Sequence, residues 1–240
     1  MTESGPLVDP AAAPAWLRPL LRATARLDAA AFTRVPAPDG DGARPAAVLI
    51  LFGESGSGPD VLLLRRADSL GSHPGQVAFP GGGAECDDQG LVHTALREAE
   101  EEVGVLPAGV RPLALLPGLY VPVSRFVVTG VIAHWQQPAP VTPVDAAETA
   151  AVARVPISYL TDPTHRFMVS VRGRYSRPAF LVPGMLVWGF TAGILDGLLR
   201  LGGWERPWDR GKVIELDEAW RRARALEVSG LMVREGETGT

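Results

Sequence analysis

The sequence predicts a protein of the α/β class, and three observations support this prediction. Residues 46–52 (AAVLILF) form a continuous apolar run, which is typical of a strand buried on both faces. Residues 60–66 and 126–135 are rich in Val, Leu and Ile and predict two further strands. Residues 91–103 place apolar side chains at helical spacing, and Gly104 follows as a left-handed cap. Strands and helices are therefore expected to share one core.

Length and composition limit the class of protein further. With 240 residues, of which 46% are hydrophobic and 21% charged, the chain suits one soluble domain with extensions. The net charge of −4 provides no basic surface for nucleic acid or for an anionic membrane. No apolar run approaches the roughly 20 residues that span a bilayer. The single cysteine, Cys86, excludes an internal disulfide, and the N-terminus lacks a secretory pattern, so we expect a cytoplasmic protein.

The N-terminal segment, residues 1–45, is rich in Ala, Pro, Gly and Asp. Apolar residues at helical spacing predict one helix over residues 16–32, and residues 36–45 have the composition of a loop. A dimer contact and a lid are both open roles for the terminal segments, so a homodimer is one possible assembly.

The strand at 60–66 follows a turn at 53–59 and leads into a polar loop. A short strand is predicted at 76–79, directly before the glycines at 81–83. These glycines are expected to let the backbone turn tightly, and their missing side chains would leave room for a phosphate group.

The predicted helix at 91–103 carries an unusual concentration of acids in its last turn. At 100° per residue, Glu98, Glu101 and Glu102 fall on one arc roughly 100° wide. Negative charge near a helix C-terminus is disfavoured by the helix dipole, and like charges at i,i+4 cost a further ~0.2–0.5 kcal/mol. The arc is either a solvated acidic face or a site that holds a cation. Residues that are locally unfavourable for the helix are typical of functional sites.

The rest of the chain alternates between strands and helices. The pattern predicts strands at 111–119, 126–135 and 151–156, a Pro-rich loop at 136–144 and a short helix at 156–160. A hairpin around Gly173, a helix ending near residue 201, a loop at 204–211 and a helix at 215–226 follow.

Four arginines cluster around the predicted hairpin: Arg166, Arg172, Arg174 and Arg177. They are either ordinary surface charge or contacts for substrate phosphates, because the planar guanidinium group matches phosphate oxygens.

One nine-residue segment resembles a known signature. Arg97-Glu98-Ala99-Glu100-Glu101-Glu102-Val103-Gly104-Val105, with its upstream glycine loop, is similar to the Nudix box of hydrolases that cleave a nucleoside diphosphate linked to another group. The resemblance implies that Glu98, Glu101 and Glu102 are metal ligands for Mg²⁺ or Mn²⁺, hard cations that prefer oxygen donors. It also implies that Arg97 orients a glutamate and that one glutamate could act as the catalytic base.

A second motif points to the substrate. The spacing R-x-x-x-L-x-x-H-x-G-Q-x-x-F-P-G-G resembles the motif of the coenzyme A pyrophosphatase subfamily, with matches at Arg66, Leu70, His73, Gly75, Gln76, Phe79, Pro80, Gly81 and Gly82. By this resemblance we predict substrate contacts at Arg66, His73, Gly81 and Gly82. Read alone, the segment is only a loop that needs Pro and Gly for its turns. Glu148, eight residues before Pro156, resembles an accessory acid of Nudix enzymes, although a solvated loop acid would look the same.

The loop before the helix departs from the usual Nudix box. The box has a glutamate eight positions before its arginine, whereas Gln89 stands there in this chain. Asp87 or Asp88 is a possible substitute, so the register of this loop stays open.

The resemblance implies a Nudix fold, an α/β/α sandwich with a mixed β-sheet, over residues 46–200, with extensions at 1–45 and 201–240. It implies divalent-metal-dependent hydrolysis of the diphosphate of coenzyme A or its derivatives, giving 3′,5′-ADP and 4′-phosphopantetheine or its acylated form. Two alternatives remain: a Nudix pyrophosphatase for NADH, ADP-ribose or another nucleotide derivative, and a catalytically silent Nudix-fold binding protein.

Overall fold

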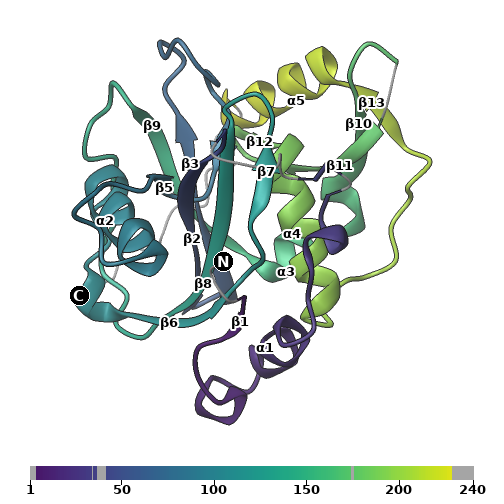
Figure 1. Ribbon diagram of the computed structural model, residues 1–240. Helices are drawn as coiled ribbons and strands as arrows, with labels where there is room; N and C mark the ends of the chain where they lie inside the picture. Colours follow the sequence, from purple (N-terminus) through teal and green to yellow (C-terminus); the bar gives the residue numbers. More distant parts are fainter. Residues whose placement is uncertain (1–3, 34, 37–41, 174–175, 229–240) are drawn as a thin grey trace, which may run out of the picture.

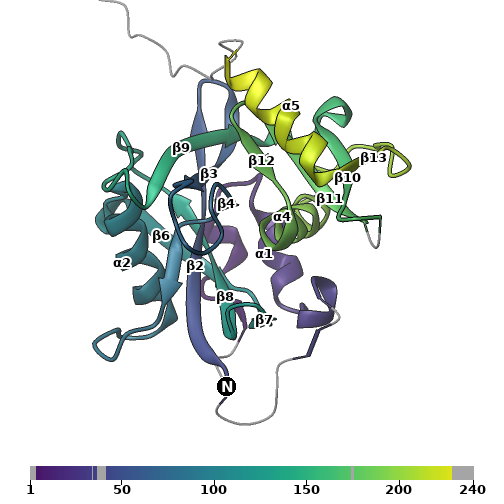
Figure 2. The ribbon, with the colours of Figure 1, turned by 90° about the horizontal axis from the view of Figure 1, so that it is seen from above.

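The computed structural model describes residues 4–33, 35–36, 42–173 and 176–228. A large mixed sheet forms its centre, with helix α2 (Leu91–Val103) on one face. Helices α1 (Arg18–Thr24), α3 (Ile157–Leu160) and α4 (Gly189–Leu201) cover the other face (Figure 1). Seen from above in Figure 2, α2 and α4 lie on opposite sides of the central strand. This arrangement confirms the predicted α/β sandwich with a mixed sheet.

Strand β2 (Arg44–Ser55) is the centre of the main sheet. It runs parallel to β8 (Phe126–Trp135) and forms a tight antiparallel hairpin with β3 (Gly58–Arg66). Leu49 and Leu51 pack into the core under α2, whereas Ile50 and Phe52 pack into the core on the opposite face. The prediction of a strand buried on both faces is therefore confirmed, because successive side chains point to opposite sides of a sheet.

The other strands of the main sheet extend or fill its edges. Its order is β1-β6-β8-β2-β3-β4, with β5 on β2, β7 on β8 and β9 on β3. The bounds are β1 Gly5–Pro6, β4 Val77–Ala78, β5 Gly81–Gly83, β6 Val110–Leu115, β7 Leu119–Val121 and β9 Thr149–Pro156.

Helix α2 has the bounds that the sequence predicts. Its buried face consists of Thr94, Ala95, Ala99 and Val103, packed against the main sheet. Gly104 ends the helix with φ of 72°, and its N–H donates to the carbonyl of Glu100 at 3.0 Å. Glycine adopts this left-handed conformation without a steric penalty, which is why a local signal was enough to place the helix end.

A second sheet lies beside the main one and was not predicted as a separate sheet. The predicted hairpin is present as β10 (Arg166–Ser170) and β11 (Ser176–Val182). Two short strands extend it: β12 (Met185–Val187) pairs with β11, and β13 (Val213–Glu215) runs parallel to β10. Helix α5 (Leu216–Val228) packs on this sheet through Ala219 and Ala223.

Three predictions about local structure were wrong in detail. The strand predicted at 111–119 is interrupted, because β6 ends at Leu115 and β7 begins at Leu119, after a Pro-Gly pair. The helix predicted at 16–32 ends at Thr24, and a separate 3₁₀ turn begins where the Asp28 carboxylate accepts the N–H of Ala30. The glycines at 81–83 form strand β5 on β2 rather than a turn.

The described parts of both terminal segments pack against residues 46–200. Strand β1 pairs with β6, and Leu20 and Leu21 of α1 are buried in the same core as α4. Strand β13 from the C-terminal segment completes the second sheet. The division into one domain and two extensions stays a prediction. Among the residues described, we find no helix with the length and apolar character that crossing a membrane requires.

Candidate active site

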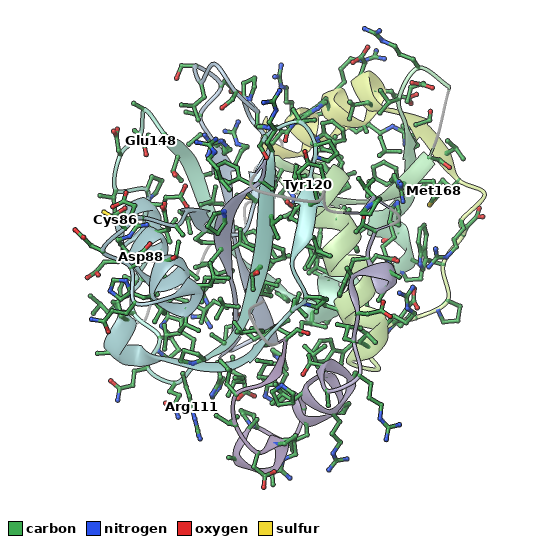
Figure 3. The ribbon with its side chains drawn as sticks, viewed as in Figure 1. Cys86, Asp88, Arg111, Tyr120, Glu148 and Met168 are labelled. Carbon is green, nitrogen blue, oxygen red and sulfur yellow. The ribbon has the colours of Figure 1, made fainter. Side chains whose placement is uncertain are left out.

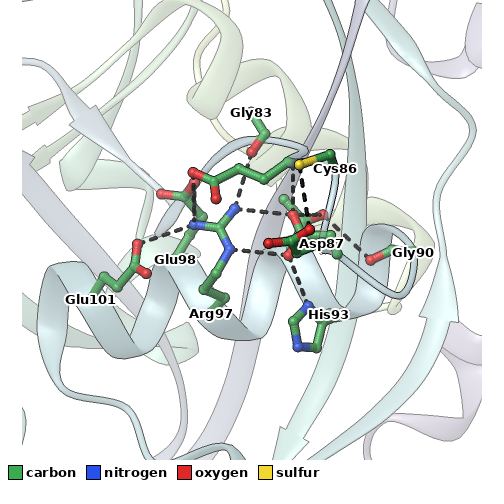
Figure 4. A network of polar contacts seen from close by, with 11 residues as sticks. Gly83, Cys86, Asp87, Gly90, His93, Arg97, Glu98 and Glu101 are labelled. Carbon is green, nitrogen blue, oxygen red and sulfur yellow. Dashed lines mark hydrogen bonds and ion pairs between the residues drawn. The ribbon is translucent and has the colours of Figure 1, made fainter.

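Arg97 on α2 is the centre of a polar network at the C-terminal end of the glycine strand β5 (Figure 4). Its Nε and Nη2 donate to the two carboxylate oxygens of Asp88 at 3.0 and 3.1 Å, and Nη2 also donates to the Gly83 carbonyl at 3.2 Å. Its Nη1 lies 3.1 Å from carboxylate oxygens of both Glu98 and Glu101. Arg97 therefore pairs with glutamates of its own helix, as predicted, and ties them to the preceding loop.

Two acids of the preceding loop contact Arg97: Asp88 is held closely, whereas Glu85 lies 3.8 Å from Nη1. The Asp88 side chain is only 3% exposed, and it accepts hydrogen bonds from His93, from the Thr94 hydroxyl and from the backbone N–H of Glu85, besides Arg97. These bonds, above all those from Arg97, hold the pKa of Asp88 far below its ordinary value. Asp87 and Gln89 are exposed, so Asp88 is the one of these three residues that contacts Arg97, and its equivalence to the glutamate of the usual box stays a prediction.

Glu102 faces the glycine strand. Its Oε2 accepts the backbone N–H of Gly81 at 3.0 Å. Burial raises the pKa of Glu102 to about 7 against the lowering effect of that hydrogen bond. The negative charges of Glu98 and Glu148 raise this pKa further, whereas the positive charge of Arg66 lowers it. Three predicted site residues from three separate segments thus act electrostatically on Glu102.

Glu98 also lies against the glycine strand. A Cβ placed on Gly82 would stand 2.4–2.6 Å from the Glu98 carboxylate, so only glycine leaves room for it there. Burial raises the pKa of Glu98, and the neighbouring Arg97 opposes this effect. Gly81 and Gly82 therefore leave room for two carboxylates, and their contact with substrate phosphate stays a prediction.

Glu101 differs from its two neighbours because its side chain is 59% exposed. Within residues 4–33, 35–36, 42–173 and 176–228, no three His, Cys, Asp or Glu side chains gather closely enough to hold a metal ion. Glu98 and Glu102 nevertheless fit a hard divalent cation. Both are oxygen donors that lose solvation and repel each other, and a bound cation would compensate that charge.

Arg66 and Glu148 approach the site from β3 and from the turn before β9. Arg66 pairs with Thr149 across the two strands, and the Glu148 carbonyl accepts the N–H of Ala67 at 2.8 Å. The Glu148 side chain is exposed at the upper end of the sheet in Figure 3. In the described part of the chain, the buried Nε of Arg66 has no hydrogen-bond partner. A buried donor of this kind is expected to meet a ligand or water.

His73 lies in the loop between β3 and β4, with φ of 54°, a left-handed conformation that is uncommon outside glycine. Its Nδ1 is 2.9 Å from Oε1 of Gln76, and the Gln76 carbonyl accepts the N–H of Arg66 at 2.9 Å. The second sequence motif is thus one hydrogen-bonded loop that begins at Arg66. A direct substrate contact by His73 stays a prediction.

The arginines near the hairpin do not form one group. Arg166 is buried, with Nη2 2.6 Å from Asp196 and 3.4 Å from Glu205, so it links the second sheet to α4. Arg166 is therefore not ordinary surface charge, and its ion pairs give it a structural role instead of a phosphate contact. Arg172 and Arg177 are exposed, and Arg174 lies outside the described residues.

Sequence reasoning missed the roles of His93 and Thr94, which fix Asp88. The signal was present but ambiguous, since both residues stand in the first turn of α2, directly after an acidic loop. Short polar side chains near a helix N-terminus commonly bond to a neighbouring loop.

Helix α2 thus places its acids against the glycine strand, and Arg97 links the helix to the preceding loop. The family model described as NUDIX domain matches residues 42–172, which is more than half of the chain. The chain belongs to the Nudix family and is a Nudix pyrophosphohydrolase.

Relatives carry the same family name without a substrate. "Uncharacterized Nudix hydrolase NudL" of Enterobacter sp. (strain 638) is 37% identical over 169 residues, covering 66% of this chain and 83% of its own length. The protein of that name from Pectobacterium atrosepticum is 36% identical over 143 residues, covering 58% and 73%. Among solved structures, the Nudix hydrolase RenU from M. smegmatis is 20% identical, with 71% of this chain and 92% of that chain covered and a TM-score of 0.46.

Proposed function

We propose that this pyrophosphohydrolase cleaves the diphosphate bond of coenzyme A or one of its derivatives. The products would be 3′,5′-ADP and 4′-phosphopantetheine, or its acylated form. The observation that carries the proposal is the position of the second motif: its first residue, Arg66, is close enough to Glu102 for its charge to lower the pKa of that carboxyl. The loop that begins there is held together by Gln76 and His73.

Glu98 and Glu102 would hold Mg²⁺ or Mn²⁺, with Glu101 as a further oxygen donor. When bound, such an ion neutralises phosphate oxygens and lowers the pKa of a coordinated water. A cation is compatible with this site, because Glu98 and Glu102 are partly buried, lie one helical turn apart and have raised pKa values that Arg97 and Arg66 offset only in part.

The remaining residues would divide the other tasks. Arg66 has a buried, unpartnered Nε that would donate to a phosphate oxygen of the diphosphate. Gly81 and Gly82 would border the bound diphosphate through their backbone. Arg97 is a positioning residue, because it fixes Glu98 and Glu101 while its other two nitrogens are held by Asp88 and Gly83.

Proton transfer would fall to an acid outside the Arg97 network. Glu148 is exposed, and its charge acts on Glu102, so it would accept the proton of the attacking water. His73 would contact the substrate beside Arg66. We also propose that residues 46–200 form the catalytic domain and that the protein acts in the cytoplasm on a small-molecule substrate.

The test is a product assay with purified protein, Mg²⁺ or Mn²⁺, and coenzyme A, NADH and ADP-ribose as separate substrates. We expect 3′,5′-ADP from coenzyme A, and a loss of about 100-fold or more in kcat for Glu98→Gln and Glu102→Gln. Glu100→Gln is the matched control, since Glu100 is an exposed acid of the same turn. A preference for NADH or ADP-ribose would reject coenzyme A as the substrate. If no substrate is hydrolysed with any cation, the alternative of a catalytically silent binding protein would be favoured.

A further inference from the structure

A cavity of about 430 Å³ lies between helix α5 and the loop that joins β3 to β4. The residues that matter for its chemistry are Asp68 and Gln76 from the loop, and Asp217, Trp220, Arg221 and Arg224 from α5. The Trp220 ring reaches the loop itself, because a Cβ placed on Gly75 would stand 3.7 Å from its Cη2 atom. Helix α5 thus forms one wall of a cavity whose other wall belongs to the second sequence motif.

Gln76 connects this cavity with the candidate active site. It lines the cavity, and its carbonyl accepts the backbone N–H of Arg66 at 2.9 Å. Arg66 is in turn close enough to Glu102 for its charge to lower the pKa of that carboxyl. Seen from above in Figure 2, β4, which begins directly after Gln76, lies between α2 and α5. The cavity therefore adjoins the loop whose first residue is a proposed contact for the diphosphate.

The α5 wall carries positive charge that the described residues do not neutralise. Within that part of the chain, Arg224 has no ion pair or side-chain hydrogen bond, and Arg221 only donates from Nε to the Asp217 carbonyl at 3.4 Å. Both arginines are exposed. Of the two acids, Asp68 pairs with Arg65 at 3.4 Å, which leaves Asp217 as the one acid beside two arginines. The wall is therefore suited to an anion with several oxygens.

Trp220 adds an aromatic face to this charged wall, and its side chain is half-buried. Nucleobases stack on aromatic side chains of this kind, and arginine binds phosphate oxygens in a planar fork. An aromatic ring beside two unpaired arginines therefore matches a nucleotide that carries an additional phosphate. An apolar ligand would leave both guanidinium groups unused.

Coenzyme A differs from NADH and ADP-ribose in such a phosphate, because its ADP half is phosphorylated at the ribose 3′ position. Six bonds separate the α-phosphorus of the diphosphate from the 3′-phosphorus, and they reach at most about 8 Å at the rise of an extended chain. With the diphosphate beside Arg66, the 3′-phosphate therefore needs a cationic site only about two residue lengths away. The cavity lined by Gln76 is the neighbouring site that offers one.

We propose that this cavity is the subsite for the 3′-phosphoadenosine half of coenzyme A and that it selects substrates with a 3′-phosphate. Arg221 and Arg224 bind the 3′-phosphate, and Trp220 stacks on the adenine ring. The inference rests on the proposed hydrolysis of coenzyme A derivatives. It gives α5, which lies outside the residues 42–172 that the family model matches, a role in substrate selection.

The first test compares kcat/KM for coenzyme A with kcat/KM for 3′-dephospho-coenzyme A. We expect a ratio of at least ten in the wild type and a ratio near one in the double variant Arg221→Gln/Arg224→Gln, because hydrogen bonds to a charged group are lost. Arg222→Gln is the matched control, since Arg222 is exposed on the same helix, pairs with Glu218 and does not line the cavity. A wild-type ratio near one would overturn the proposal, as would an equal fall in the control.

Trp220 is tested by the binding of 3′,5′-ADP to metal-free protein, followed by calorimetry. Trp220→Leu removes the ring and is expected to weaken this binding at least five-fold, whereas Trp220→Phe keeps a ring and should stay within about two-fold of the wild type. Thermal unfolding checks that both variants fold, since Trp220 also packs on the loop at Gly75. A folded Leu variant that binds as the wild type does would refute the stacking role.

The same binding measurement separates this inference from the proposed function, because 3′,5′-ADP contains no diphosphate to be cleaved. We expect 3′,5′-ADP to bind the wild type at least ten-fold more tightly than adenosine 5′-monophosphate, and this difference should disappear in the double arginine variant. Such binding without any hydrolysis of coenzyme A would support the subsite and reject the proposed function. Hydrolysis of coenzyme A with equal binding of the two nucleotides would reject the subsite alone.

Discussion

Asp88 and Arg97 are joined by two hydrogen bonds, from Nε to Oδ1 at 3.0 Å and from Nη2 to Oδ2 at 3.1 Å. A planar guanidinium group held at two nitrogens by one carboxylate has a fixed orientation. Its third nitrogen, Nη1, is thereby directed at Glu98 and Glu101. The loop before α2 thus sets the position of the acids at the end of α2.

Asp88→Asn is therefore expected to lower kcat by about 10- to 100-fold, because small displacements of catalytic groups have effects of this size. It should also lower the melting temperature, since the Arg97 charge loses its main partner. Steady-state kinetics and thermal unfolding measure the two effects. Asp87→Asn is the control: Asp87 is exposed on the same loop and should change neither quantity. Equal losses in both variants would contradict the assignment of Asp88.

The contrast between Asp87 and Asp88 also shows where sequence reasoning stops. The bounds of α2 could be predicted because its signals are local: apolar spacing along the helix and Gly104 at its end. The choice between the two aspartates depends on contacts with Thr94 and Arg97, six and nine residues away. A loop one residue longer than the common form offers several registers, and only the folded geometry selects one.

Long-range pairing limits prediction of the fold in the same way. Strands β12 and β13 have three residues each, and β13 pairs with β10 across more than 40 residues of chain. Such short segments carry no reliable periodicity. The hairpin of β10 and β11 could be predicted, but the two short strands that complete the second sheet could not. The long buried strand β2 could be predicted from its composition alone.

Gly82→Ala is expected to reduce activity more than its neighbour Gly83→Ala. A Cβ at Gly82 would stand 2.4–2.6 Å from the Glu98 carboxylate and must displace it. A Cβ at Gly83 would meet only the Phe126 ring at 3.5 Å, which is an ordinary contact. We expect a loss in kcat of about ten-fold or more for Gly82→Ala and a much smaller one for Gly83→Ala. Similar activities in the two variants would show that catalysis does not depend on the present position of the Glu98 carboxylate.

Stability of the metal-free protein should depend on pH through Glu102. Its pKa is about 7 in the folded state, against about 4.5 ordinarily, so the folded state keeps a proton that the unfolded chain loses. Stability therefore falls as pH rises from about 4.5 to 7. Glu102→Gln removes this effect and should be more stable than the wild type at pH 8, by at most about 3 kcal/mol, and similar at pH 4.5.

Urea unfolding at the two pH values, in the presence of a chelator, measures the difference for Glu102→Gln. Glu100→Gln serves again as the control, because its exposed side chain should leave the pH dependence unchanged. The prediction is contradicted if the wild type gains stability relative to Glu102→Gln between pH 4.5 and 7. That result would mean that folded Glu102 does not retain its proton. Saturating Mg²⁺ should stabilise the wild type more at pH 8 than at pH 5, because the ion replaces the proton.

The substitution Arg66→Lys distinguishes the effect of the positive charge of Arg66 from that of a hydrogen bond donated by its Nε. Lysine keeps the positive charge near Glu102, but it cannot place a guanidinium nitrogen where Nε is buried. If that nitrogen donates to the substrate diphosphate, kcat/KM should fall about 10- to 100-fold, as expected for a lost hydrogen bond to a charged group. The melting temperature in the absence of substrate should stay near that of the wild type. Arg111→Lys is the matched control, since Arg111 bonds the Ala12 carbonyl away from the site. A folded Arg66→Lys variant with wild-type kcat/KM would remove Arg66 from the proposed diphosphate site.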